Sequence, residues 1–370
     1  MRRLLRGVLA LVMLAGLCLL PVLASAEAAR PKDYAPLFSK EQAAFEEGTI
    51  AYRLYLPPDY DERKSYPLVL FLHGIDRSGS DNESQLEDGM MRQYFAGDTA
   101  QRYPCIIAAP QVPLARIPAL LALMSPRPLE EAREALQTRL TSQLAAQLTT
   151  QYSVDPDRVY VTGLSMGGIG TWDLVLHHPD QFAAAIPICG VGNPNGAQRM
   201  KEMNLRVFHG AADPIVPVSG SRDVVQALRE AGSAVQYIEY PGEGHTCWDR
   251  AYSDPETFPW LFAQIRPGSA VDAAPLREKL EAARSALPSL AGQEREAMQA
   301  AIEYAAPLAE AQALTQHQLD KALALFPEPA AAAMTQESPA FPWLAAGGAA
   351  LVCIAALVIL LAWRRRRAVR

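Results

Sequence analysis

A serine in a glycine-rich turn has the setting best suited to covalent chemistry in this chain. Ser165 lies in the middle of Gly163-Leu-Ser-Met-Gly167, after a short β-prone run at 159–161 and before a stretch at 171–178 that is expected to be helical. A strand, a sharp turn carrying serine and a helix together make a nucleophile elbow, where glycines remove the Cβ atoms that would clash. A helix that begins at the serine also directs backbone N–H groups toward the place where an oxyanion forms. The pentapeptide alone also fits an ordinary turn, so the interpretation depends on the acid and the base that should follow it.

A nucleophilic serine needs a histidine base and a carboxylate that orients the histidine. In elbow folds both follow the serine, the acid first and the histidine second. His245 lies in a glycine-flanked loop after the last predicted strand, and Asp213 lies in the loop after the preceding strand. Asp249 is the alternative acid, but it lies four residues past His245, where it would start or cap the next turn. The other histidines precede the serine, end a helix or a strand, or lie outside the predicted sheet: His73, His177, His178, His209 and His317. The sequence therefore predicts a triad of Ser165, Asp213 and His245.

Two backbone donors should stabilise the oxyanion. The N–H of Met166, directly after the serine, is one candidate, and the N–H of Ile75, in the loop after His73-Gly74, is the other. Asp76 follows immediately, and a carboxylate there would oppose the developing negative charge unless it is turned away or paired. Arg77 and solvent are the candidates for neutralising it.

Short apolar runs that alternate with helical segments indicate how these residues are positioned. An amphipathic helix is expected within 129–152, while the apolar segment 113–128 either covers a cleft or crosses the surface. The alternation predicts an α/β fold with a doubly wound, mostly parallel sheet that carries helices on both faces and closes near residue 265. The strands are expected at 49–56, 68–72, 106–109, 159–161, 183–188, 205–208 and 235–240.

Charge and cysteine content exclude some classes of partner and site. Without the eight arginines of the two terminal segments, the formal charge of −6 becomes −14, which argues against nucleic acid as a partner. Cys105, Cys189 and Cys247 have no metal-ligand spacing, and no metal or cofactor is expected. Cys189 and Cys247 follow a central strand and the predicted base, so in an oxidising compartment they could pair. Two separate buried thiols are the alternative.

Several motifs in order resemble the α/β-hydrolase superfamily, and within it secreted carboxylesterases of the phospholipase/carboxylesterase, feruloyl-esterase and polyhydroxybutyrate-depolymerase type. The resemblance covers about residues 45–265 and implies the triad named above and cofactor-free ester hydrolysis through an acyl-enzyme. Relatives commonly have His-Gly-x-Gly at the oxyanion loop, whereas Asp76 stands at the fourth position here. The motifs are Phe71-Leu-His-Gly74, Gly79-Ser-Asp-Asn82, Ala109-Pro-Gln111, Gly163-Leu-Ser-Met-Gly-Gly168, His209-Gly-Ala-Ala-Asp213 and Gly244-His-Thr-Cys-Trp-Asp249.

The two ends of the chain carry targeting patterns. Residues 1–26 have a basic start, an apolar run and Ala24-Ser25-Ala26, which predict a secretory signal cleaved after Ala26 or, alternatively, an uncleaved anchor. Residues 343–363 are uncharged and long enough for a transmembrane helix, and the basic tail at 364–370 predicts a cytoplasmic C-terminus. A buried helix of a soluble domain is the alternative for 343–363.

These patterns divide the chain into a catalytic domain and its attachments. We expect the α/β-hydrolase domain at 45–266, a helical segment at 275–326 and a Pro/Ala-rich tether at 327–342. The prediction is an extracytoplasmic serine esterase that is anchored in the membrane and acts on small or polymeric esters. A serine peptidase with the same fold, or an inactive binding module of the cell envelope, would fit the same pattern.

Overall fold

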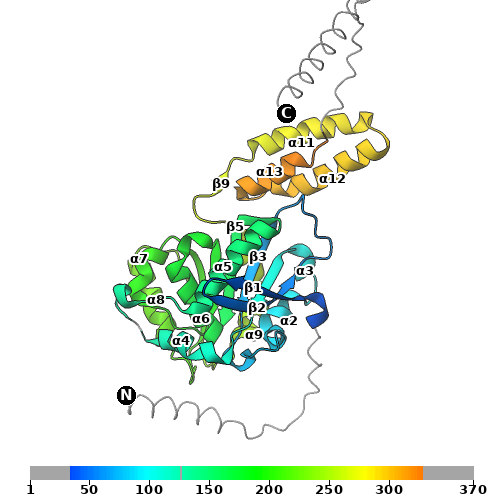
Figure 1. The fold of residues 1–370 in the computed structure, drawn as a ribbon. Coiled ribbons are helices and arrows are strands. Elements are labelled where there is room, and N and C mark those ends of the chain that lie inside the picture. The colour runs from blue at the N-terminus through cyan, green and yellow to red at the C-terminus, as the bar shows by residue number, and fades with distance from the viewer. Residues whose placement is uncertain (1–33, 126, 328–370) are drawn as a thin grey trace, which may run out of the picture. The chain divides into compact units, whose positions relative to one another are not determined.

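The computed structural model describes residues 34–125 and 127–327 (Figure 1). The predicted signal peptide at 1–26, the transmembrane segment at 343–363 and the tail at 364–370 lie outside the described residues, as does the tether at 327–342 apart from its first residue. Within the described part of the chain, no helix has the length and apolar character needed to cross a membrane.

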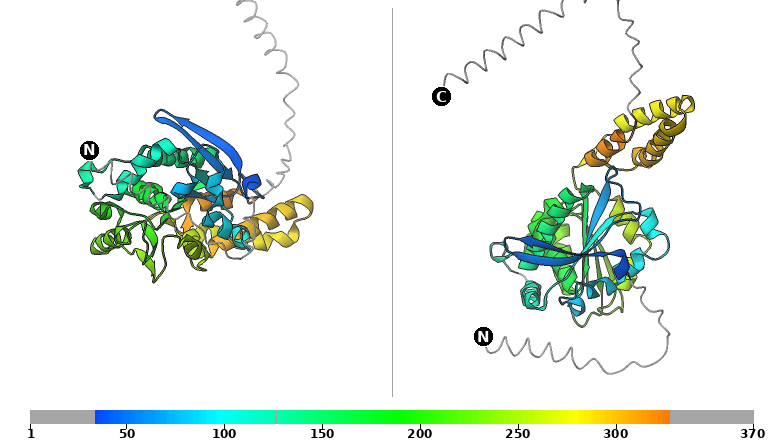
Figure 2. Two further views of the ribbon diagram at one scale, coloured as in Figure 1. Left: turned by 90° about the horizontal axis from the view of Figure 1, so that it is seen from below. Right: turned by 45° about the vertical axis from the view of Figure 1, so that its right-hand side comes forward.

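One eight-stranded sheet organises the fold, in the order β1-β2-β4-β3-β5-β6-β7-β8. β2 pairs antiparallel with both β1 and β4, and the other neighbours are parallel, so the sheet is mostly parallel as predicted. Figure 2 shows β1 and β2 as a long antiparallel hairpin in blue. The strands are β1 (Ser39–Phe45), β2 (Gly48–Tyr55), β3 (Tyr66–Leu72), β4 (Ile106–Pro110), β5 (Val154–Leu164), β6 (Ala184–Ile188), β7 (Asn204–Gly210) and β8 (Gln236–Tyr240).

Helices cover both faces of this sheet, and alternate residues of the central strands explain how. Leu68 and Leu70 of β3 belong to the apolar cluster that contains side chains of α5, α6 and α8, whereas Val69 and Phe71 belong to the cluster that contains side chains of α2, α9 and α10. Side chains alternate across a strand, so a strand that is buried on both faces is apolar at every position. The α-helices of this domain are α2 (Gly89–Tyr94), α3 (Thr99–Arg102), α4 (Ile117–Leu121), α5 (Leu136–Gln151), α6 (Met166–His177), α7 (Ala197–Met200), α8 (Ser219–Glu230), α9 (Trp248–Ser253) and α10 (Thr257–Ala263).

Short 3₁₀-helices lie between the strands and helices of the described chain. They are η1 (Ala35–Leu37), η2 (Ile75–Arg77), η3 (Ser84–Glu87), η4 (Leu114–Arg116), η5 (Ala122–Met124), η6 (Leu129–Glu131), η7 (Pro179–Gln181), η8 (Pro194–Gly196) and η9 (Leu287–Ser289).

A small helical segment follows the sheet and has its own apolar core. It contains α11 (Ala274–Ala286), α12 (Gly292–Ala309) and α13 (Gln316–Ala324), with β9 (Ala270–Val271) paired antiparallel to β10 (Leu314–Thr315). Leu276, Leu280 and Ala305 are buried among these helices. Polar contacts join the segment to the sheet domain: the Ser65 N–H donates to the Tyr304 hydroxyl at 2.9 Å, and the Thr315 hydroxyl donates to Asp155 at 2.7 Å.

Two boundaries differ from the sequence prediction for physical reasons. The sheet starts at Ser39, before the expected domain start at residue 45, because β1 is an edge strand with only Ala43 buried and so lacks an apolar pattern. The helix expected within 129–152 starts only at Leu136. Ala135 has an extended backbone there, and its N–H donates to the Asp173 side chain at 3.1 Å instead of to a helical carbonyl.

Candidate active site

Ser165 lies at the sharp turn between β5 and α6, with φ 55° and ψ −119°. This backbone conformation is strained for any residue with a Cβ, and such residues concentrate at functional sites. The turn fits only because of its glycines: a Cβ on Gly167 would collide with the carbonyl of Leu72, and one on Gly163 with the carbonyl of Gly167. The sequence prediction of a strand, a turn and a helix is therefore confirmed in its geometry.

The three predicted triad side chains form one hydrogen-bonded chain. Nε2 of His245 lies 2.8 Å from Oγ of Ser165, and Nδ1 of His245 lies 2.6 Å from Oδ2 of Asp213. A carboxylate can only accept, so the proton of the neutral imidazole resides on Nδ1 and leaves Nε2 free to accept from the serine hydroxyl. The arrangement has the donor and acceptor order that a general base requires.

Asp213 is held as a buried carboxylate by several donors. Its side chain is fully buried, and Oδ1 accepts from the N–H groups of Ile215 and Val216 at 2.8 and 2.9 Å. Burial alone raises the pKa of Asp213, but hydrogen bonds from His209, His245 and these amides outweigh it and hold the pKa below its ordinary range. The alternative acid, Asp249, is half exposed and pairs with Arg92 at 3.3 Å.

His209 is a part of this site that the sequence reasoning missed. It lies at the end of β7, and its Nε2 lies 3.0 Å from the carbonyl of Val216. The same Nε2 lies 3.2 Å from Oδ2 of Asp213, so the aspartate oxygen that accepts from His245 has a second histidine beside it. Burial lowers the pKa of His209, and the hydrogen bond to Asp213 outweighs it, so that the pKa is raised. The motif His-Gly-x-x-Asp could have predicted this contact. A tight turn directly after a strand brings the aspartate back beside the histidine at the strand end.

The loop that carries His245 is fastened to the end of β7. The N–H of Ala212 donates to the carbonyl of Glu243 at 2.9 Å. Gly210 allows this approach, since a Cβ there would lie within 2.6 Å of the same carbonyl oxygen. The ring of Trp248 packs perpendicular to that of His245, at 5.5 Å between ring centroids.

The predicted oxyanion donors, Ile75 and Met166, each begin a helix. Ile75 is the first residue of η2 and Met166 the first of α6, so neither N–H has an acceptor within its own helix. The loop after β3 and the turn that carries Ser165 lie close together. A Cβ added to Gly74 would lie 3.0 Å from the side chain of Leu164, the residue before Ser165. Asp88 also holds the loop after β3, because its side chain accepts the Gly74 N–H at 3.3 Å.

His73 is a structural residue of the oxyanion loop. Nε2 accepts from the N–H of Val112 at 2.9 Å, so the ring proton lies on Nδ1 and is donated to the carbonyl of Gly74 at 2.6 Å. Burial lowers the pKa of His73, which keeps this ring neutral. The histidine thereby joins the loops that follow β3 and β4.

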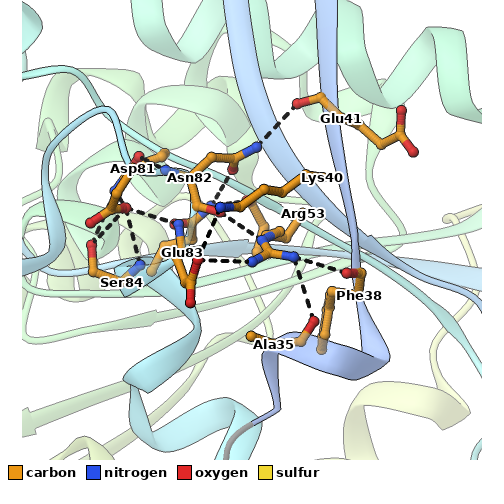
Figure 3. Close-up of polar contacts among 12 residues, drawn as sticks. Ala35, Phe38, Lys40, Glu41, Arg53, Asp81, Asn82, Glu83 and Ser84 are labelled. Atoms are coloured by element: carbon orange, nitrogen blue, oxygen red, sulfur yellow. Dashed lines mark hydrogen bonds and ion pairs between the residues drawn. The ribbon is translucent and has the colours of Figure 1, made fainter.

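A polar network anchors the remainder of the loop after β3 (Figure 3). The Asn82 side chain donates to the carbonyls of Glu41 and Tyr52 at 3.2 and 3.0 Å. Buried Arg53 donates to the carbonyls of Asn82 and Phe38 at 2.6 and 2.9 Å. These bonds tie the loop to β1 and β2, and they give the motif residue Asn82 a structural role.

Asp76 is turned outward and paired. Its side chain is 64% exposed, and Oδ2 lies 3.6 Å from Nε of Arg77. The same arginine pairs with Glu87 at 3.0 Å. The repulsion expected for an inward, unpaired carboxylate therefore does not apply in this conformation.

The segment 113–125 forms an apolar wall beside the serine. Leu120 packs on Met166, directly after Ser165. Leu121, Leu123 and Met124 pack on Ile169, Val191 and Val216. The segment therefore packs against the start of α6, next to Ser165.

One group of side chains near the triad has the composition of a metal site. Ligand atoms of Cys189, His209 and Asp213 lie within 4.8 Å of one another. Each is already engaged, however: Asp213 by two histidines, His209 by Val216 and Ser221, and Cys189 by Cys247. The hydrogen-bonding groups of all three side chains therefore have partners within the protein.

The family model named Esterase, described as "Putative esterase", matches residues 44–272. The chain belongs to this esterase family. A probable carboxylesterase of Oryza sativa subsp. japonica is 24% identical over 237 residues, which cover 58% of this chain and 96% of the relative. Poly(3-hydroxyalkanoate) depolymerase C of Paucimonas lemoignei is 46% identical over 48 residues, or 13% of this chain and 12% of the relative.

Among solved structures, a thermostable esterase superposes with a TM-score of 0.58 and 34% identity, covering 63% of this chain and 64% of that one. The fold is that of an α/β-hydrolase, and the esterase is a hydrolase of the carboxylesterase type. The family match includes Ile75, Ser165, Asp213 and His245, whereas α11 to α13 lie beyond it.

Proposed function

We propose that this esterase hydrolyses carboxylic esters through an acyl-enzyme formed on Ser165. The observation that carries the proposal is the hydrogen-bonded chain from Ser165 Oγ through His245 to Asp213, with distances of 2.8 and 2.6 Å. Nucleophile, base and orienting acid lie within the reach that proton transfer requires.

The reaction follows from this geometry. His245 Nε2 takes the proton of Ser165 as Oγ attacks the ester carbonyl, and the N–H groups of Met166 and Ile75 stabilise the oxyanion. The tetrahedral intermediate collapses, and the imidazolium returns its proton to the leaving alcohol. Water, activated by the same histidine, then releases the carboxylic acid and restores the serine. Asp213 stabilises the imidazolium in both halves.

The surroundings favour esters with an apolar part. Of the four large apolar side chains that are exposed in the described part of the chain, Ile75, Leu114 and Ile215 follow β3, β4 and β7 at the carboxyl edge of the sheet. Ligands of open α/β sheets bind at this edge. Together with the wall formed by 113–125, these side chains supply apolar surface for an acyl or alkyl group.

We place the catalytic domain outside the cytoplasmic membrane, on a C-terminal anchor. The support is in the sequence: the secretory pattern at 1–26 and the uncharged run at 343–363 before four arginines. The substrate would then be an extracytoplasmic ester, either small or polymeric.

A fluorophosphonate probe and a panel of p-nitrophenyl esters test the mechanism. The parent should be labelled on Ser165 and should hydrolyse the esters, whereas Ser165→Ala should lose labelling and lose activity by a factor on the order of 10⁴ or more. Ser253→Ala, at an exposed serine of α9, is the matched control and should behave like the parent. His245→Ala should also fail, while His178→Ala, which alters a histidine bonded to Glu134, should not.

The two alternatives give different outcomes. A folded parent that neither reacts with the probe nor hydrolyses any ester would indicate the binding module. Faster cleavage of peptide anilides than of matched esters would indicate the peptidase.

A further inference from the structure

Two buried sulfur atoms lie against each other beside the triad. Sγ of Cys189 and Sγ of Cys247 are 3.0 Å apart, although the residues are 58 positions apart in the chain. Both side chains are essentially fully buried. The third described cysteine, Cys105, is buried elsewhere and donates its thiol hydrogen to the Tyr94 hydroxyl.

Each cysteine lies close to a residue of the proposed mechanism. Cys189 follows β6, whose last residue, Ile188, accepts the N–H of Ser165 at 2.9 Å. Cys247 follows His245 by two positions and is the N-cap of α9. A bond between the two sulfurs would therefore join the histidine loop to the strand that supports the serine.

The backbone holds Cys189 in an unusual conformation that directs it here. Its φ is +50°, in the left-handed region that residues other than glycine seldom adopt. Its N–H donates to the carbonyl of Phe208 at 2.9 Å, which ties the residue after β6 to the neighbouring strand β7.

We propose that Cys189 and Cys247 form a disulfide that fastens the His245 loop when the chain folds in the presence of a disulfide oxidant. A disulfide bond is about 2.05 Å long, so the sulfurs need to approach by only about 1 Å. The inference goes beyond the proposed esterase mechanism, because the bond depends on the position of the sulfurs and not on catalysis.

The chemistry balances with a disulfide as the electron acceptor, either a small-molecule disulfide or that of a thiol–disulfide oxidoreductase. The Cys189 thiolate attacks one sulfur of the oxidant and displaces the other as a thiolate, which gives a mixed disulfide. Cys247 then loses its proton and attacks Sγ of Cys189, and the second oxidant sulfur leaves. Two cysteine thiols have lost two protons and two electrons, and the oxidant has become two thiols. Because both sulfurs are buried, the exchange takes place before the loop closes over them.

Peptide mapping under non-reducing conditions tests the bond. The full-length chain is refolded in buffers that range from reduced to oxidised glutathione, alkylated in denaturant and digested. We expect a linked peptide of Cys189 and Cys247 in oxidised buffer, with Cys105 alkylated throughout. Alkylation of both cysteines in every buffer, or a link from either one to Cys18, Cys105 or Cys353, would overturn the proposal.

Heat inactivation tests whether the bond fastens the loop. Reduction should lower the midpoint of inactivation of the parent by about 5 °C or more, because the closed loop is long. Cys105→Ser should show the same shift and unchanged hydrolysis, while Cys189→Ser and Cys247→Ser should show no shift. A parent midpoint that does not respond to reduction would refute the fastening role.

Ser165→Ala separates this inference from the proposed function. It should retain the linked peptide even though hydrolysis is lost. Formation of the link in a parent that hydrolyses no ester would leave the disulfide standing and remove the esterase mechanism alone.

Discussion

At the scale of single residues, backbone strain is concentrated around the site. Among the described residues, the only non-glycine positions with positive φ are Asn82, Ser165 and Cys189. Asn82 anchors the loop that continues from Ile75, a proposed oxyanion donor. Ser165 is the proposed nucleophile, and Cys189 lies against the loop of His245, the proposed base. Strain of this kind persists only where surrounding contacts over-determine it. Here those contacts are the carbonyls of β2, β6 and β7.

His209 gives the first prediction, as a positioning residue that acts through Asp213. Replacing it with leucine removes the donor 3.2 Å from Oδ2 of Asp213, so the carboxylate can rotate away from His245. We expect kcat to fall by about 10- to 100-fold with little change in KM, because only orientation in the reacting complex is disturbed. Steady-state kinetics on a p-nitrophenyl ester measure both constants.

His209→Gln is the matched control, since its amide N–H can reach the same oxygen. It should recover part of the loss in kcat. Equal losses in both variants, at equal melting temperature, would show that the contact with Asp213 is not what matters.

Asp88 gives a prediction for the pH dependence of stability. Burial raises its pKa to about 6, above the ordinary value of 3.8. Between these values the folded chain binds a proton that the unfolded chain does not, so the contribution to stability is present at acid pH and is lost as the pH rises through about 6. From about pH 4 to about pH 8, the free energy of unfolding of the parent should fall relative to that of Asp88→Asn by on the order of 2 to 3 kcal/mol.

Urea unfolding of both proteins at several pH values measures this difference. Other titrating groups are common to the two proteins and cancel. A difference that stays constant with pH would mean that Asp88 keeps its charge when folded.

The sequence predicted the proposed triad better than the residues that support it. The chain order of serine, acid and histidine, with a strand before each, selected Ser165, Asp213 and His245 without knowledge of distances. The roles of His209 and Asp88 were not visible, because each depends on a contact made by a turn whose shape the residue types do not specify. For Cys189 and Cys247 the sequence left a pair and two separate thiols as alternatives, and the structure brings the two sulfurs into contact.

At the scale of elements, burial pattern decided what could be predicted. The strands buried on both faces were found, since every residue from Leu68 to Phe71 is apolar and fully buried. The edge strand β1 was missed, because six of its seven residues are not buried. The start of α5 was misplaced because Asp173, on another helix, binds the N–H that would have continued it. Tertiary contacts of this kind override local propensity.

Thr315 gives a prediction for the attachment of the helical segment. Its hydroxyl accepts the Gln318 N–H as the N-cap of α13 and donates to Asp155, whose carboxylate is fully buried. Thr315→Val removes the cap and leaves the buried carboxylate without this donor, so stability should fall by about 2 kcal/mol or more. Urea unfolding measures the loss.

Thr315→Ser keeps the hydroxyl and should remain within about 1 kcal/mol of the parent. Since the contact lies at the start of β5, far along the strand from Ser165, hydrolysis by the folded valine variant should equal that of the parent. Similar stability of the valine and serine variants would show that the segment is not held by this contact.

At the scale of the whole molecule, the helical segment belongs with the catalytic domain, and the residues beyond it belong to the proposed anchor. The contacts of Tyr304 and Thr315 with Ser65 and Asp155 hold α11 to α13 on the sheet domain. A chain that ends at residue 327 keeps all of these contacts and loses the uncharged run at 343–363 and the arginines that follow. We expect it to be active and to leave the membrane fraction, where the full-length chain should remain. Ester hydrolysis in the soluble and sedimented fractions after high-speed centrifugation measures the distribution.

A chain that ends at residue 269 is the informative comparison, because it removes the helical segment as well. It leaves the buried carboxylate of Asp155 without the Thr315 hydroxyl and the N–H of Ser65 without the Tyr304 hydroxyl, so it should be much less stable and should yield little soluble activity. Equal activity and melting temperature in the two truncated chains would mean that the segment contributes nothing to the catalytic domain. Sedimentation of the chain that ends at residue 327 together with the full-length chain would mean that membrane association resides elsewhere than in 343–370.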